Sequence, residues 1–148
     1  MQIRTISISV SAPRDEVFGF LANVENLPKW ATGYCDCVEL RSDGWWAYTL
    51  QGEMFVELAA DDHTGVIDLR VGPSAAQLGL LPLRVLPLPE GDAMVSLTFI
   101  QPASQPDDLY ERQYRLFSLE LQRFIRRFGG GELHRSGGVP QLCALGRN

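Results

Sequence analysis

The chain has 148 residues and a mass of 16.5 kDa, a size that suits one domain around one hydrophobic core. Its 45% hydrophobic content is ordinary for a globular protein and argues against a disordered chain. Thirteen basic against eighteen acidic residues give a net charge of −5, so nucleic acid is not an expected partner. Apolar and polar residues alternate near the N-terminus, which therefore lacks the apolar core of a signal peptide. No apolar run reaches the roughly 20 residues of a membrane span. We therefore expect no transmembrane segment and a cytoplasmic location.

The first thirty residues predict a strand followed by two short helices. Residues 2–10 alternate apolar and polar side chains, as a half-buried strand does. Pro13 suits the first turn of a helix, where its missing N–H is no loss. Pro28 disfavours helical dihedrals in the residue before it, so the first helix is expected to end near Ala22. A second short turn or helix then carries Trp30.

The middle of the chain predicts a series of hairpins. Turn signals recur at intervals typical of one antiparallel sheet, and they separate strands at 34–41, 45–50, 53–60, 66–71, 82–88 and 93–101. Residues 72–79 are expected to form a longer connection. The strand at 82–88 contains Pro82 and Pro87, which favours an edge position or an irregular strand.

Residues 107–128 predict one long amphipathic helix. Its apolar side chains recur at helical spacing and form one stripe, made of Tyr110, Tyr114, Phe117, Leu121, Phe124, Ile125 and Phe128. Leu116 and Leu119 stand outside that stripe and would meet the first helices or another subunit, so a homodimer is a possibility. A seven-stranded antiparallel sheet must bury one face, and this helix is the obvious cover. The predicted class is α+β, with a curved sheet wrapped around a long C-terminal helix.

The predicted domain covers residues 1–128. Three consecutive glycines at 129–131 end the long helix. We interpret residues 129–148, which are rich in glycine, as a flexible C-terminal tail. An ordered strap or an arm that reaches another subunit is the alternative interpretation.

The order of these elements is similar to that of a known superfamily. The stretch "ISVSAPRDEVFGFLANVENLPKW" resembles the opening of the START-type helix-grip superfamily, which includes the birch-pollen allergens, and "ERQYRLFSLELQRFIRRF" resembles that superfamily's C-terminal helix. The resemblance covers residues 2–128 and is strongest to the polyketide cyclase/dehydrase-like branch. It implies a deep, mostly apolar cavity between sheet and helix that holds a hydrophobic small molecule. It does not identify that molecule, because one fold hosts many functions.

The helix stripe is rich in aromatic residues, which independently suits a ligand pocket. Aromatic walls with a few polar tips fit ring-shaped or lipid-like ligands, although an aromatic stripe can also be plain core. A buried tyrosine hydroxyl needs a partner, and a solvent-filled cavity supplies one. The predicted ligand-binding residues are Trp30, Tyr48, Met54, Tyr110, Gln113, Tyr114 and Phe117.

Asp36 is one weak candidate for acid–base catalysis. It shares strand parity with Val38 and Leu40, and an inward carboxyl in an apolar cavity would have a raised pKa. The opposite parity, that of Cys35 and Cys37, would place Asp36 in solvent, and a bulge would reverse the assignment.

Two further polar residues are weak catalytic candidates. Glu120 flanks the helix stripe, as Gln113 does, and could reach the rim of a cavity. Arg84 lies among apolar residues and could bind a carboxylate or an enolate, or it could simply extend from an edge strand into water.

No metal site or cofactor is expected. Cys35 and Cys37 form a C-x-C pair, but two thiolates need further ligands, and His63 and His134 are not at a recognisable spacing. Phosphate-binding glycine loops, G-x-S-x-G and H-E-x-x-H are all absent from the sequence.

Three hypotheses about function follow from the sequence. The first is a protein that binds or carries an apolar ligand. The second is a cofactor-free polyketide cyclase or dehydratase, whose chemistry requires a positioned acid or base. The third is a regulatory protein that interacts through the helix face and the tail. An apolar cavity would favour the first, a hydrogen-bonded polar pair inside it the second, and a collapsed core the third.

Overall fold

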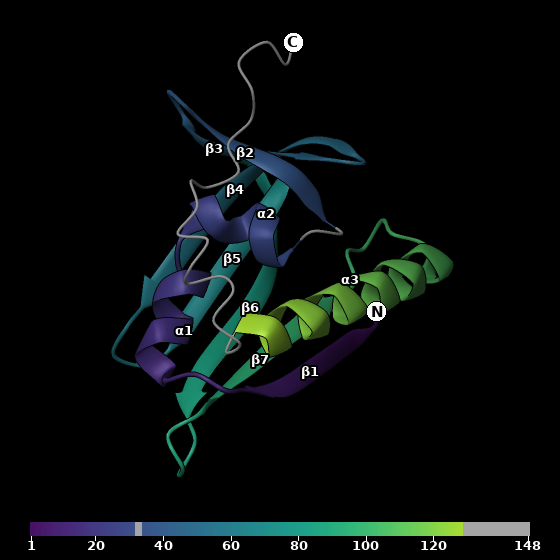
Figure 1. The fold of residues 1–148 in the computed structure, drawn as a ribbon. Helices are drawn as coiled ribbons and strands as arrows, with labels where there is room; N and C mark the ends of the chain where they lie inside the picture. Colours follow the sequence, from purple (N-terminus) through teal and green to yellow (C-terminus); the bar gives the residue numbers. More distant parts are fainter. Residues whose placement is uncertain (32–33, 129–148) are drawn as a thin grey trace.

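The chain folds as one curved seven-stranded antiparallel sheet with helices on one side (Figure 1). The computed structural model describes residues 1–31 and 34–128, and side chains as far as residue 123. Strand order across the sheet is β1-β7-β6-β5-β4-β3-β2. The strands are β1 Ile3–Val10, β2 Cys35–Arg41, β3 Gly44–Thr49, β4 Gly52–Asp61, β5 Val66–Ser74, β6 Gln77–Pro87 and β7 Ala93–Ile100. The helices are α1 Arg14–Leu21, α2 Leu27–Trp30 and α3 Asp107–Phe128. The predicted α+β helix-grip architecture is confirmed, whereas the predicted tail at 129–148 lies outside the described residues.

The first helices begin and end where local chemistry allows. The carbonyl of Pro13 accepts the N–H of Val17 at 3.1 Å, which opens α1. Asn23 then caps a short 3₁₀ turn by accepting the N–H of Glu25 at 3.0 Å. The prediction for the residue before Pro28 is wrong: it has helical dihedrals of φ −54° and ψ −45°, because Pro28 stands in the first turn of α2.

The connection between β5 and β6 is shorter than predicted. Both strands continue into a tight hairpin in which Ser74 pairs with Gln77, and a bulge interrupts β5 between Val71 and Ser74. Gly72 is required there, because a Cβ on it would lie 1.7 Å from the carbonyl oxygen of Gln77. The extra residue of the bulge lets the hairpin curl away from the rest of the sheet.

The sheet divides between β6 and β7, and this division explains how a central strand accommodates proline. β6 pairs with β7 only from Leu83 to Pro87, whereas β7 continues alongside β1 as far as Ile100. Residues 77–82 of β6 therefore pair with β5 alone. Pro82 lies in this stretch, where a missing N–H is tolerated, so the edge interpretation holds for the first half of β6.

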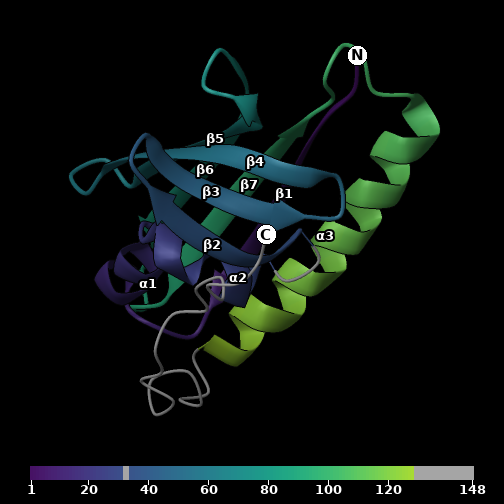
Figure 2. The same ribbon diagram turned by 90° about the horizontal axis from the view of Figure 1, so that it is seen from above.

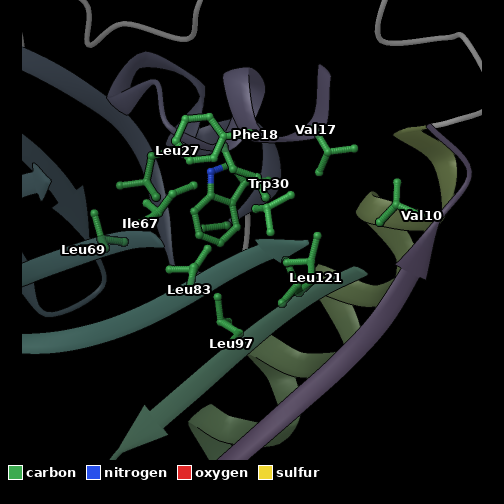
Figure 3. Packing of buried hydrophobic residues seen from close by; sticks show 14 of the residues in the cluster. Val10, Val17, Phe18, Leu27, Trp30, Ile67, Leu69, Leu83, Leu97 and Leu121 are labelled. Atoms are coloured by element: carbon green, nitrogen blue, oxygen red, sulfur yellow. The ribbon is translucent and has the colours of Figure 1, made fainter. Parts of the chain in front are cut away.

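The core lies between the concave face of the sheet and the helices. Trp30 is 1% exposed, and its ring lies among Ile67, Leu83 and Leu121 at the centre of the buried cluster (Figure 3). The Trp30 indole N–H has no hydrogen-bond partner among the described residues. Trp30 thus anchors α2 by packing rather than by polar contacts.

α3 crosses the concave side of the sheet obliquely and lies next to β1 (Figure 2). Its inner face is Tyr110, Tyr114, Phe117 and Leu121, as the stripe predicted, and the side chains of the later stripe residues lie outside the described part. Leu116 and Leu119 are 47% and 49% exposed on the outer face. α2 packs on both β2 and α3, so one end of α3 is held by the N-terminal helices while the other leaves the sheet uncovered.

Candidate functional site

A cavity of about 850 Å³ opens between α3 and the divided part of the sheet. Its walls come from the inner face of β5 and the first half of β6, from the end of β7, and from the first half of α3. Leu81 and Leu69, which pair across β5 and β6, form part of the floor. The volume suits a drug-sized or lipid-sized molecule. The cavity exists because β6 and β7 separate before α3 can pack against both.

Aromatic rings form a continuous wall on the α3 side. Phe99 of β7 makes edge contacts with Tyr114 and Phe117, each at a centroid distance of 5.1 Å. Tyr34 stacks on Phe117 at 6.2 Å with an interplanar angle of 25°. Tyr110 lies nearly parallel to Tyr114 at 6.4 Å. Such a wall presents flat π-faces and ring edges to an occupant.

An ion pair from β1 supports this wall. Arg4 shares the inward face of β1 with Ile6 and Ile8, and its Nη1 donates to Glu111 Oε2 at 2.8 Å while Nη2 donates to Oε1. The same guanidinium lies 4.9 Å from the Tyr114 ring centroid and 5.8 Å from that of Tyr110. The side-chain hydrogen bond from Arg4 lowers the pKa of Glu111. The charges therefore stabilise each other outside the cavity and hold both tyrosine rings in place.

The tyrosine hydroxyls have different environments. Tyr110 donates to the carbonyl oxygen of Phe99 at 2.6 Å, so its hydrogen is used within the protein. Tyr34 lines the cavity, and its hydroxyl has no hydrogen bond to any residue that the structure describes. Burial, with a smaller contribution from Cys35, raises the pKa of Tyr34. Tyr34 is therefore a neutral phenol that can donate to a molecule in the cavity.

The mouth of the cavity is rimmed by uncharged polar residues. Gln105 Nε2 donates to Gln113 Oε1 at 2.7 Å across the start of α3. Gln101, which is 5% exposed, fixes this loop by donating to the carbonyl oxygen of Gln105 at 2.9 Å and to Asp107 at 2.8 Å. Gln51 and Gln77 come from the facing hairpins. The amides can donate or accept hydrogen bonds without adding charge.

The structure brings most of the predicted ligand-binding residues to one cavity. Those that line the cavity are Met54, Tyr110, Gln113, Tyr114 and Phe117. Trp30 does not line it but packs behind Phe117, at a centroid distance of 6.3 Å. Tyr48 lies away from it, where its hydroxyl donates to Glu39 at 3.0 Å and accepts from Arg41 at 2.8 Å. That these residues bind a ligand stays a prediction.

The three weak catalytic candidates do not line the cavity. The pairing of β2 with β3 shifts between Cys35 and Cys37, and this bulge leaves Asp36 exposed. Arg84 is exposed on β6 between two buried residues, so it points to the opposite face of the sheet. Glu120 is half-buried on α3, beyond the part of the helix that forms the wall.

Sequence reasoning missed Arg4 and Tyr34. The parity of β1 places Arg4 on the same face as Ile6 and Ile8, and this signal could have found it. For Tyr34 the sequence carries no comparable signal, because its position depends on the turn that leads from α2 into β2.

In the described part of the chain, no group of three or more His, Cys, Asp or Glu residues could hold a metal ion. None of the described helices is long and apolar enough to cross a membrane.

Among the described residues, Cys35 is a free cysteine; it is 2% exposed, and burial raises the pKa of its thiol to about 12. This thiol is therefore protonated and inert at neutral pH.

Comparisons with known proteins match the fold but not the sequence. No protein-family model matches the chain, and neither does any curated protein. Among solved structures, XoxI from Bacillus cereus is 14% identical, with a TM-score of 0.68 over 90% of this chain and 99% of that one. The Zhui aromatase/cyclase from Streptomyces sp. R1128 is 19% identical, with a TM-score of 0.63 over 93% of this chain and 100% of that one. A START superfamily protein from Mycobacterium smegmatis is 12% identical, with a TM-score of 0.61 over 90% and 98%.

Proposed function

This chain has the helix-grip fold of START-type proteins, and we propose that it uses this fold to bind a hydrophobic small molecule between the sheet and α3. The observation that carries the proposal is the cavity of about 850 Å³ with its wall of aromatic rings. An apolar ligand that displaces water from an apolar cavity wall lowers the free energy of the complex by roughly 25 cal/mol per Å² of apolar surface buried. Ring-shaped and lipid-like molecules both have enough apolar surface to be stabilised in the cavity in this way.

A binding role is better supported than the cyclase alternative. Proton transfer at neutral pH is most efficient with a group whose pKa lies near the working pH. The titratable side chains in the described lining are tyrosines, and burial raises the pKa of both Tyr34 and Tyr110 further. The likeness to an aromatase/cyclase concerns a chain that is 19% identical, and fold alone does not carry activity across. We propose a binding or carrier protein.

Native mass spectrometry of freshly purified protein tests this proposal most directly. We expect an apolar molecule of one compound class to co-purify and to dissociate on denaturation. A panel of lipids and polycyclic aromatic compounds, followed by thermal shift, then identifies stabilising ligands, because a ligand that binds only the folded state raises its stability. An apo spectrum together with no stabilisation by any compound would refute the proposal.

Two glycines provide a matched pair of variants. Gly79 belongs to the inward face of β6, and a Cβ there would meet nothing closer than the carbonyl oxygen of Val71 at 3.6 Å. Gly79→Trp should therefore fill the cavity without straining the backbone and abolish ligand binding. Gly19 lies exposed on α1, where a Cβ meets nothing within 4 Å. Gly19→Trp adds the same ring away from the cavity and should bind normally.

A further inference from the structure

The described lining of the cavity is electrically neutral throughout. It consists of aliphatic and aromatic side chains, glutamines, a serine, prolines and glycines, with tyrosine as the only titratable type. Burial holds Tyr34 and Tyr110 in their neutral forms, since it raises the pKa of each. A charged group that enters such a site loses its hydration and finds no opposite charge there, which is strongly unfavourable.

Charged side chains of the surrounding elements are placed elsewhere. On β1 and on the elements that form the walls, the described charged residues outside the lining are Arg4, Lys29, Glu53, Glu57, Asp61, Asp68, Arg70, Arg84, Asp107, Asp108, Glu111, Arg112, Arg115, Glu120 and Arg123. The Arg4 guanidinium lies 4.9 Å from the Tyr114 ring centroid, and Glu111 pairs with both of its terminal nitrogens. The charge of this cation is therefore already compensated by Glu111.

A neutral hydrogen-bond donor is nevertheless available in the lining. The Tyr34 hydroxyl has no partner among the described residues, and its ring is held against Phe117 at 6.2 Å. An unpaired donor next to apolar surface favours an occupant that supplies an acceptor. Carbonyl, ether and hydroxyl oxygens meet this need without charge.

We propose that the cavity selects uncharged apolar molecules that carry an oxygen acceptor for Tyr34, and that it rejects the corresponding carboxylates and amines. This inference deepens the proposed function and rests on it. The neutral wall excludes the charged forms, the rings hold the apolar body, and Tyr34 orients the molecule. A carrier of this kind takes up neutral precursors or products and leaves their ionised forms in solution.

Matched probe pairs test the selection, because the two members of each pair have nearly the same shape and differ in charge. Anthracene-2-carboxamide is compared with anthracene-2-carboxylate, and hexadecanamide with hexadecanoate, each titrated by calorimetry at pH 7.5. We expect at least one carboxamide to bind, and its carboxylate to bind at least about a hundredfold more weakly. Equal affinities within each pair, or a preference for the carboxylate, would overturn the inference while leaving the proposed function intact. If no member of either pair binds, the inference fails, and the native mass spectrum and the compound panel decide the proposed function.

The pH dependence gives a second readout of the same selection. Only the protonated acid should enter the cavity, so the affinity for anthracene-2-carboxylate should rise about tenfold for each unit by which the pH falls from 7.5 to 5.5. The carboxamide should show no such slope over this range. Parallel slopes for both probes would mean that a protein group titrates and would contradict the inference.

Two variants separate the donor from the charge. Tyr34→Phe should weaken carboxamide binding about tenfold and leave unsubstituted anthracene unchanged, since only the former accepts a hydrogen bond. Unchanged carboxamide affinity would remove Tyr34 from the proposal. Gln113→Lys adds a cation to the wall and should bring the carboxylate to within about tenfold of the carboxamide. Gln122→Lys, on the same helix but outside the lining, should keep the parent selectivity.

Discussion

Tyr114 is the residue at which binding and stability can be measured together. Its ring contacts Phe99 edge-on at 5.1 Å, lies nearly parallel to Tyr110 at 6.4 Å, and carries the Arg4 guanidinium at 4.9 Å. It also forms part of the cavity wall. Replacing it by alanine removes all of these contacts and enlarges the cavity at once.

The expected magnitudes follow from those contacts. An aromatic pair contributes about 0.5–1.5 kcal/mol and a cation–π contact about 0.5–1 kcal/mol. Because the ring is only half-buried, we expect Tyr114→Ala to lower the free energy of unfolding by about 2–3 kcal/mol. The same change should weaken binding of an apolar ligand by about 1 kcal/mol or more, which is at least fivefold. Tyr114→Phe keeps the ring and should retain most of both quantities.

Urea unfolding followed by circular dichroism measures the stability, and calorimetry with a ligand from the panel measures the affinity. Tyr48→Ala is the control for binding, since Tyr48 lies away from the cavity and should leave affinity unchanged. A folded Tyr114→Ala protein with unchanged affinity would show that α3 does not form the binding wall. A loss of affinity that Tyr48→Ala reproduces would point to general loosening instead.

Three other outcomes test local features of the fold. Gly72→Ala should destabilise the protein by about 3 kcal/mol or more in urea unfolding, because the new Cβ would lie 1.7 Å from a carbonyl oxygen of β6, whereas Gly79→Ala has room and should be nearly neutral; similar effects of both would refute the bulge. Since Arg4 lowers the pKa of Glu111, this pair should stabilise the protein above about pH 4.5, the unfolded value, and lose its effect as the pH falls through the folded value. Glu111→Gln should therefore flatten the acid side of the stability curve, and an unchanged curve would contradict the pairing. With its pKa raised to about 12, Cys35 should resist iodoacetamide at pH 8 in folded protein and react in urea, as peptide mapping would show; rapid labelling in the native state would refute its burial.

Much of the architecture was predictable because it depends on local patterns. Alternation predicted β1 as a half-buried strand, and helical spacing found the inner face of α3 through Leu121. Pro13 predicted the start of α1. These signals are properties of neighbouring residues, so a single sequence contains them.

The site was harder to predict because it depends on where distant segments separate. The expected edge character of the strand with Pro82 was the one hint that β6 leaves its neighbour, yet the register with β7 was needed to see where. Strand parity left Asp36 open between the cavity and solvent, and the bulge in β2 leaves it exposed. Tyr48 has the aromatic ring and the polar hydroxyl that suit a pocket residue, but it lies away from the cavity, beside Glu39 and Arg41.

The sequence by itself determined the order of strands and helices along the chain, the aromatic face of α3, and the short helices that carry Trp30. These follow from periodicity and from proline and glycine chemistry, which act over a few residues. Only the tertiary structure decided that β6 residues before Leu83 leave β7, that Arg4 reaches Glu111, and that Tyr34 faces a neutral cavity. Those facts depend on register, curvature and packing between segments up to 107 positions apart, and local patterns carry no record of them.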